Sequence, residues 1–478
     1  MNIKLVARYI GVALLFNAAF MFISLIVSMI NGFDSSFSPL LLSTLITATV
    51  GCFPLIFVRK NEDVGLKEGY AITFFSWFLS FVFGMLPYVL WGEPFSLPNA
   101  WFESVSGYTT TGSTILTDIE SLPKGLLFWR FSTHYIGGIG VMIFMLMVLP
   151  AVSAFTLRKI EISNLSKDNY KYKTKHTLVV IGSTYLGITF ITAISLFLAG
   201  MPVFDAVGHS MTIVATGGFS CKNLSIAAYD SKSIEIISTI FLYISSLHFG
   251  MLYAFVVKRS LVIFKSAVFR YYTLMIVILS LLIAFNLVYS ENALSWGDAL
   301  IKSSFQVVSV ITTTGLASAD TNMWPLFSIL ILVLAMNHGA CSGSTSGGIK
   351  ADRIWIFIYA LKRQITKQLH PNAVIPVKVG NTMINSQMVI STLIYIVTYI
   401  VVAFIVTILL SLMGVGLVEA LSGSFASISN MGPGFGECGA MGNFANFPAL
   451  GKFVLTIEMF LGRLEIYVVL VIFYLFRR

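Results

Sequence analysis

One stretch of the chain occurs four times, and each copy stands between two long apolar segments. Residues 102–112 and 305–315 match best, and both end in Thr-Thr-Thr-Gly. Residues 208–218 form a looser copy, and residues 425–434 form the faintest one. Each copy is typical of a short semi-polar helix followed by a small turn that contains glycine. A repeat of this kind favours folds in which four similar turns meet around one axis.

The apolar segments predict a helical membrane protein. Hydrophobic residues make up 57% of the 478 residues and charged residues only 11%, whereas soluble chains carry about 25% charged residues. The runs approach the ~20 residues that span a bilayer and do not alternate, which indicates helices rather than a barrel. We expect an all-α polytopic membrane protein, with four pseudo-symmetric helix–pore loop–helix repeats around one pore. The predicted units are two N-terminal helices with a connector in residues 1–68 and repeats at 69–176, 177–270, 271–386 and 387–478, with ten spanning helices in all.

The basic residues predict the orientation of the chain. Lys and Arg are enriched in cytoplasmic loops, and on this layout most of the 30 Lys and Arg residues fall on one side. Both termini are therefore expected in the cytoplasm, as part of a multi-pass protein of the cytoplasmic membrane. The net charge of +9 then reflects topology, and we expect no nucleic-acid partner. The connectors assigned to the cytoplasm are residues 59–68, 151–176, 258–270 and 350–386.

The turns offer the groups that a K⁺ ion needs in place of water. A ring of backbone carbonyls replaces the hydration shell of K⁺, and glycine permits the positive φ that such a turn requires. Each short helix also directs its negative C-terminal end inward. The unequal turns of repeats two and four predict a less sharp discrimination between ions than identical turns would give. We predict carbonyl ligands from Thr110, Thr111, Gly112, Ala215, Thr216, Gly217, Thr313, Thr314, Gly315, Asn430, Met431 and Gly432.

The second helix of repeat three loses its apolar character after Met336. Irregular polar backbone is tolerated at membrane depth only where protein or water satisfies it, so this segment is expected to line the cavity directly below the ring. Its small polar residues suit it to block and release ions. The alternative is a simple cytoplasmic loop that begins at His338. The residues predicted to form this gate are Gly343, Ser344, Thr345, Ser346, Gly347 and Gly348.

Two charges, Arg463 and Glu465, fall within the last apolar segment. Charged residues at this depth usually face a cavity or a partner. Arg463 facing the pore would raise the barrier for cations, and an internal ion pair that only fixes packing is the alternative. Glu103, on the first short helix, is expected either to strengthen the field at the ring or to hydrogen-bond the turn. Arg130 and His134 are interpreted as structural.

Other classes of protein fit less well. A symporter that couples K⁺ to H⁺ or Na⁺ needs a titrating acid within the membrane, for which Glu103 and Glu465 are the candidates. An enzyme needs clustered catalytic groups, and the sequence offers none, so we expect no enzymatic activity. Residues 434–439 match a nucleotide-binding glycine pattern but follow no expected strand.

Several motifs resemble those of the TrkH-like pore subunits of the Trk/Ktr/HKT superfamily of K⁺ uptake proteins. They are Phe102-Glu-Ser-Val-Ser-Gly, the Thr-Thr-Thr-Gly turns, Gly208-His-Ser, His370-Pro-Asn-Ala-Val and Leu461-Gly-Arg-Leu-Glu, and the similarity runs over essentially the whole chain. This resemblance implies K⁺ translocation in a bacterial inner membrane, with K⁺ as substrate and no covalent cofactor. It also implies an intramembrane gate loop beside Arg463. As partners, it implies a homodimer and a TrkA-like cytoplasmic subunit that binds NAD- or ATP-type nucleotides.

Overall fold

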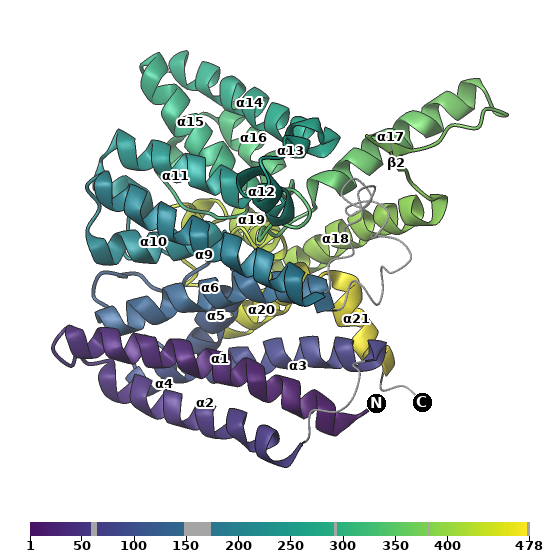
Figure 1. The fold of residues 1–478 in the computed structure, drawn as a ribbon. Coiled ribbons are helices and arrows are strands. Elements are labelled where there is room, and N and C mark those ends of the chain that lie inside the picture. The colour runs from purple at the N-terminus through teal and green to yellow at the C-terminus, as the bar shows by residue number, and fades with distance from the viewer. Residues whose placement is uncertain (59–64, 148–173, 291–293, 381, 476–478) are drawn as a thin grey trace.

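The computed structural model of the chain describes residues 1–58, 65–147, 174–290, 294–380 and 382–475. Two N-terminal helices, α1 (Ile3–Ile30) and α2 (Phe37–Phe57), lie side by side at one edge of the molecule (Figure 1). They cross where a Cβ on Gly11 would lie 2.6 Å from the carbonyl oxygen of Gly51. Small residues at helix crossings let backbones approach closely within a membrane.

Four helical units follow, and each contains a first helix and then a short helix. The first helices are α3 (Leu66–Gly84) continued by α4 (Leu86–Trp91), α9 (Thr174–Leu198), α14 (Ala267–Val288) and α18 (Ser386–Leu412). The short helices are α5 (Leu97–Tyr108), α10 (Val203–Ala215), α15 (Trp296–Ile311) and α19 (Leu417–Ser429). This order agrees with the repeat predicted from the sequence.

The second helices of the units differ from one another. Only α6 (Lys124–Met147) is continuous. The others are the pairs α11 (Lys232–Ser245) and α12 (Phe249–Val256), α16 (Leu326–Met336) and α17 (Ala351–Leu369), and α20 (Ala449–Arg463) and α21 (Ile466–Leu475).

The sequence did not predict the breaks in the second helices of repeats two and four. The first pair bends by 106°, because His248 caps α12 by accepting from the backbone N–H groups of Gly250 and Met251. The second pair breaks at Glu465, whose φ is +65°. The break in repeat three is the one that the sequence predicted.

The remaining elements are short. They are the helical turns η2 (Ser225–Tyr229), α13 (Val262–Lys265), η3 (Thr321–Met323) and η4 (Gly436–Cys438), and the strands β1 (Lys378–Val379) and β2 (Thr382–Met383), which pair with each other. In Figure 1, α17 and this hairpin project away from the rest of the molecule.

Six helices of the described chain are each long and apolar enough to cross a membrane: 3–30, 37–57, 67–91, 179–198, 267–288 and 386–412. The bent pair of α11 and α12 passes the same test only when taken together. The chain is therefore a polytopic, all-α membrane protein. The total of ten spans stays a prediction, because several of the expected spans are broken helices.

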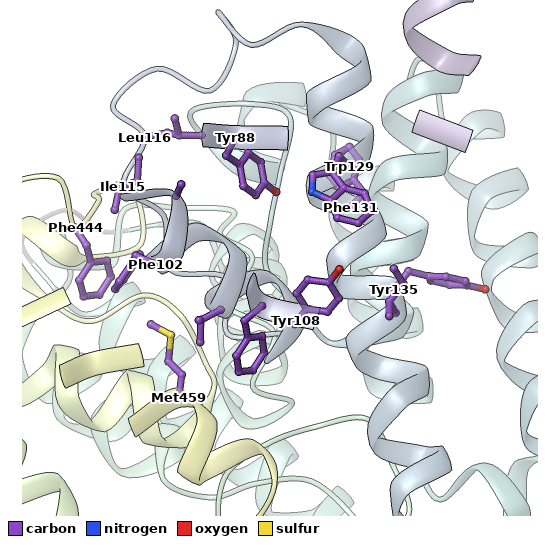
Figure 2. Packing of buried hydrophobic residues seen from close by; sticks show 14 of the residues in the cluster. Tyr88, Phe102, Tyr108, Ile115, Leu116, Trp129, Phe131, Tyr135, Phe444 and Met459 are labelled. Carbon is purple, nitrogen blue, oxygen red and sulfur yellow. The ribbon is translucent and has the colours of Figure 1, made fainter. Parts of the chain in front are cut away.

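The short helix α5 sits in an aromatic core. Figure 2 shows Phe102 and Tyr108 from α5 among Tyr88, Trp129 and Met459, which come from α4, α6 and α20. All of them are buried. Side chains packed at this density hold a helix in a single position, and a fixed short helix fixes the turn that follows it.

Candidate functional site: a ring of four turns

Each short helix ends in the same backbone conformation. The residue at or just after the helix end adopts the left-handed region, and a glycine with positive φ follows two positions later. The left-handed residues are Thr110 (φ 51°), Thr216 (54°), Thr313 (56°) and Asn430 (55°), and the glycines are Gly112 (84°), Gly218 (90°), Gly315 (76°) and Gly432 (94°). A β-branched residue such as Thr is a genuine outlier there. Strain of this kind clusters at functional sites.

The second repeat is shifted by one residue from the predicted set. Ala215 is the last residue of α10, and the glycine with positive φ is Gly218 rather than Gly217. The equivalent turn is therefore 216–218, so Ala215 leaves the set and Gly218 joins it. The adjacent glycines made the choice ambiguous in the sequence, whereas the backbone angles decide it.

The four turns close into a ring in chain order. A Cβ on Gly112 would lie 2.3 Å from the carbonyl oxygen of Gly217, in the next repeat. A Cβ on Gly218 would lie 2.2 Å from that of Thr314, and one on Gly315 would lie 2.0 Å from that of Met431. The circle is completed by Gly432, where a Cβ would lie 2.4 Å from the carbonyl oxygen of Thr111. Each glycine therefore lies against a carbonyl oxygen of the following turn, and the space between the two turns holds no side chain at the glycine position.

In two of the four turns, the carbonyl oxygens have no hydrogen-bond donor in the described chain, whereas that of Gly432 in the fourth turn accepts from the Ser113 hydroxyl at 3.0 Å. Among the described residues, no N–H or O–H group donates to the carbonyl oxygens of residues 110–112 or 313–315. The Thr residues of both turns are fully buried. Buried carbonyls are nearly always paired in proteins. Unpaired carbonyls held by strained turns are therefore suited to bind a cation without its water.

Hydroxyl groups support the turns from behind in repeats one and three. Ser106 Oγ donates to the carbonyl oxygen of Ser113, and Ser309 Oγ donates to that of Leu316, both at 2.6 Å. Acidic residues lie in the first turns of the short helices of repeats two, three and four, where they face the positive helix end. These residues are Asp205, Asp298 and Glu419.

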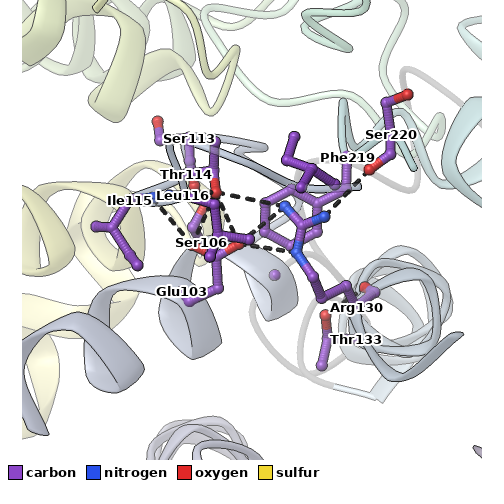
Figure 3. A network of polar contacts seen from close by, with 12 residues as sticks. Glu103, Ser106, Ser113, Thr114, Ile115, Leu116, Arg130, Thr133, Phe219 and Ser220 are labelled. Carbon is purple, nitrogen blue, oxygen red and sulfur yellow. Dashed lines mark hydrogen bonds and ion pairs between the residues drawn. The ribbon is translucent and has the colours of Figure 1, made fainter. Parts of the chain in front are cut away.

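Glu103 holds the segment that follows the first turn, as Figure 3 shows. Its carboxylate accepts from the Thr114 hydroxyl at 3.0 Å and from the backbone N–H of Ile115 at 3.1 Å. It also forms a buried ion pair with Arg130 at 2.9 Å. Of the two roles left open for Glu103, these contacts favour the hydrogen-bonding one.

Arg130 extends this network to the second repeat. It donates to the carbonyl oxygen of Ser220 at 3.1 Å, and its guanidinium lies 4.1 Å from the centre of the Phe219 ring. His134 accepts from the backbone N–H of Phe219 at 3.0 Å and contacts the carbonyl oxygen of Gly107 at 2.7 Å. Arg130 and His134 therefore both fix the turns of repeats one and two relative to each other. The sequence did not reveal that these two side chains lie between the turns.

The polar segment 338–350 lies directly against the ring. The backbone N–H of Gly347 donates to Thr313 Oγ1 at 2.7 Å, and the Thr345 hydroxyl donates to the carbonyl oxygen of Val214 at 3.1 Å. A Cβ on Gly347 would lie 2.2 Å from the carbonyl oxygen of Ser429. The segment thus touches the ends of the short helices in three repeats. The alternative of a simple loop outside the membrane does not fit these contacts.

Arg463 reaches the same segment from the fourth repeat. It is only 4% exposed, and it donates to the carbonyl oxygen of Thr345 at 2.6 Å and to that of Gly137 at 3.3 Å. Lys350, also buried, donates to the backbone carbonyl of Ser346. Two cationic groups therefore hold the segment where it meets the ring. The alternative for Arg463, an internal ion pair, is not seen among the described residues, because Glu465 pairs with Arg353 instead, at 2.7 Å.

Glu458 is an intramembrane acid that the sequence reading missed. It is fully buried in α20 and accepts from the Ser424 hydroxyl at 2.8 Å. Its second oxygen has no hydrogen-bond partner in the described chain. No described cation pairs with it, in contrast to Glu103 and Glu465.

The basic connector at 151–176 lies almost wholly outside the described residues. Its assignment to the cytoplasm therefore stays a prediction.

Comparison with known proteins agrees with this architecture. A family model described as TrkH, cation transport protein, matches residues 43–476. The Trk system potassium uptake protein TrkH of Salmonella typhimurium is 31% identical over 484 residues, covering 99% of both chains. That of Halomonas elongata is 32% identical over 480 residues, covering 99% of this chain and 98% of the relative.

A solved structure has the same fold over the full length. The crystal structure of the potassium transporter TrkH from Vibrio parahaemolyticus superposes with a TM-score of 0.91 at 28% identity, and each chain is covered completely. The match includes all four units and the N-terminal pair of helices. The chain belongs to the TrkH family of cation transport proteins.

Proposed function

We propose that this protein carries K⁺ into the cell through the ring of turns. The observation that carries the proposal is the closed circle of glycines and carbonyls, in which buried oxygens of residues 110–112 and 313–315 have no donor among the described residues. K⁺ is the ion for which protein carbonyls best replace water. The names of the relatives from Salmonella and Halomonas, both potassium uptake proteins, add support.

The ring is built from unequal parts, which bears on selectivity. Repeats one and three present Thr-Thr-Gly, while the structure aligns Thr216-Gly-Gly218 and Asn430-Met-Gly432 with them. The Asn430 amide donates to Thr111 Oγ1 at 3.1 Å and to the carbonyl oxygen of Met459 at 2.8 Å. Repeat four is thus braced by a side chain that the other repeats lack. We therefore expect K⁺ to be preferred over Na⁺ by a smaller margin than in a ring of four identical strands.

The polar segment 338–350 is proposed as the gate. In the described conformation it lies against the turns and is held by Arg463. Passage of ions requires this segment to move away, which breaks its hydrogen bonds to Thr313, Val214 and Arg463. Its glycines, among them Gly343 (φ 81°) and Gly348 (φ 66°), leave the backbone free to change conformation.

Two kinds of partner are proposed. A second copy of the chain would form a dimer, and a cytoplasmic nucleotide-binding subunit would control the gate. The arm formed by α17 supports an external partner, because it projects from the molecule and leads directly into the gate segment (Figure 1). Its outer residues include exposed Leu361 and Ile365 beside Lys362. Both termini are proposed to face the cytoplasm.

Ion flux into liposomes that hold the purified protein tests the proposal. K⁺, Na⁺ and proton gradients are varied separately. Flux that follows the K⁺ or Rb⁺ gradient alone supports a passive pore. Flux that requires a proton or Na⁺ gradient supports the second candidate, a symporter. That candidate is favoured by one observation, the buried acid Glu458 without a cationic partner among the described residues.

A further inference from the structure

A cavity of about 410 Å³ lies beside the gate segment. Its wall is formed by the break between α11 and α12, the start of α14, the start of α17 and the turn between the two strands. Cys341 and Ser342, from the first part of the gate segment, also line it. The cavity therefore touches two of the three helix breaks at once.

The polar groups of this cavity suit an anion. Lys265 and Arg270 line it, and neither forms an ion pair with any described residue. His248 also lines it, and because its Nδ1 accepts two backbone N–H bonds, its Nε2 carries the proton and is a donor. One carboxylate, Asp352, is present and accepts from the Ser342 hydroxyl. Two cations and a neutral donor thus oppose a single acid.

The surroundings identify the anion as part of a lipid. The segment just before Lys265 combines exposed apolar residues with basic ones. Val256, Val257, Leu261 and Phe264 are all at least half exposed, and the adjacent pair Lys258 and Arg259 lies among them. Such a segment is typical of the boundary between the acyl chains and the headgroups. Apolar side chains, including Met251 and Phe269, line the cavity next to the basic ones.

We propose that this cavity binds the phosphate-bearing headgroup of an acidic phospholipid, and that its occupancy holds the gate segment against the ring. Only the second part of this proposal, the effect of the lipid on the gate segment, rests on the proposed function. The His248 ring packs on Gly343, where a Cβ would lie 2.5 Å from its Cδ2, and the Phe249 N–H donates to the carbonyl oxygen of Gly343 at 3.2 Å. A ligand that contacts His248 and Ser342 stabilises the conformation in which the cavity exists. In that conformation the segment touches the turns.

Binding is tested on the full chain in detergent by native mass spectrometry, with phosphatidylglycerol, phosphatidylcholine and inorganic phosphate as probes. The wild type is expected to retain phosphatidylglycerol in preference to phosphatidylcholine. The double variant Lys265→Gln/Arg270→Gln is expected to lose affinity by about 30-fold, since each of the two basic residues near an anionic headgroup contributes on the order of 1 kcal/mol. The matched control is Lys258→Gln/Arg259→Gln, which removes the same charge from the same connector but outside the cavity.

Three results would overturn the lipid site. They are equal losses in the two double variants, equal retention of the two lipids by the wild type, and displacement of phosphatidylglycerol by millimolar inorganic phosphate. The first indicates a diffuse surface attraction, and the last a site for free phosphate. None of these three measurements depends on ion flux, so they test the lipid site independently of the proposed transport.

The effect on the gate is tested by Rb⁺ flux into vesicles of phosphatidylcholine with and without phosphatidylglycerol. The acidic lipid is expected to lower flux through the wild type and the control variant, and to leave flux through Lys265→Gln/Arg270→Gln unchanged. An equal reduction in all three proteins would contradict the coupling. Absence of Rb⁺ flux in every vesicle, with specific lipid binding intact, would refute the transport proposal and leave the lipid site in place.

Discussion

The guanidinium of Arg130 lies 2.9 Å from the carboxylate of Glu103, and neither side chain is exposed to solvent. The pair joins α5, which precedes the first turn, to α6, and Arg130 also binds the segment after the second turn. A buried ion pair of this kind fixes position rather than adding much stability, because the desolvation of both charges offsets their attraction. Removing one partner of the pair still lowers the free energy of unfolding, because the other charge then stays buried without a counter-ion.

Glu103→Gln is expected to destabilise the protein by about 3 kcal/mol, since it leaves Arg130 buried without its counter-ion. Thermal unfolding in detergent measures the change. Glu120→Gln is the matched control, because it breaks the pair of Glu120 with Lys222, whose side chains are 44% and 34% exposed, and exposed pairs contribute about 0–1 kcal/mol. Equal shifts for the two variants would contradict the assigned role of Glu103.

Gly218→Ala is expected to lower K⁺ flux by about tenfold or more, which corresponds to at least 1.4 kcal/mol. The added Cβ would lie 2.2 Å from the carbonyl oxygen of Thr314 at a residue with φ of +90°. Gly297→Ala is the control, since its Cβ would meet nothing closer than Ser295 Oγ at 4.0 Å. If flux through Gly218→Ala equalled that of the control, Gly218 would not form part of the pathway for ions.

Arg463→Gln is expected to raise flux several-fold. The substitution weakens the hydrogen bond to Thr345, and bonds from charged groups are worth about 1.5–3 kcal/mol, so the gate segment leaves the ring more often. Rb⁺ uptake into liposomes measures the effect. Arg353→Gln serves for comparison, because that arginine pairs with Glu465 rather than with the gate segment. A folded Arg463→Gln protein with unchanged or reduced flux would argue against the gate.

Glu458→Gln separates a pore from a proton-coupled symporter. The amide keeps the shape of the side chain and the bond with Ser424 but removes the titrating proton. For a passive pore, we expect K⁺ flux and its response to a proton gradient to match those of the wild type. Loss of a proton-driven component in this variant alone, with Glu465→Gln as the control, would establish coupling through Glu458.

Asp34 is expected to make stability depend on acid pH. Burial by itself raises the pKa of Asp34, but hydrogen bonds from Ser28, from Ser36 and from the backbone of Gly125 outweigh it, so that the pKa is lowered overall. A lowered pKa in the folded state contributes stability above the unfolded value, near pH 4, and this contribution is lost as the pH falls below it.

Unfolding temperatures of the wild type and Asp34→Asn between pH 3.5 and 7 measure this effect. The two proteins are expected to differ most at neutral pH and to converge in acid. Asp230→Asn, at a carboxylate to which no described group donates a hydrogen bond, is the matched control. A constant difference between wild type and Asp34→Asn across the range would contradict the assignment.

The sequence predicted most of the architecture, because its signals were long and repeated. The two N-terminal helices, the order of helices in each unit and the interruption after Met336 agree with the structure. Its errors lie where the signal is a single residue. The bend before α12 depends on one capping side chain, His248, and His occurs in many other contexts.

The site was harder to predict where it depends on partners far apart in the chain. Glu103 and Arg130 are 27 residues apart, and no local pattern links them. Glu458 is an acid in the same apolar segment as Arg463 and Glu465, so the signal that marked those two residues was present for it as well, but the sequence does not show that it lies against Ser424. Backbone angles were needed to assign the register of the second turn, because the sequence alone does not distinguish Gly217 from Gly218.

The closed circle of glycines and carbonyls is made by one chain, and this has a consequence for control. In a ring of four identical subunits, any change to one turn appears in all four. Here each quarter has its own sequence, so the proposed gate segment belongs to the third alone and the arginine that binds it, Arg463, to the fourth. On this proposal, one partner that acts at one place would be enough to alter the pathway, while the other quarters keep their conformation.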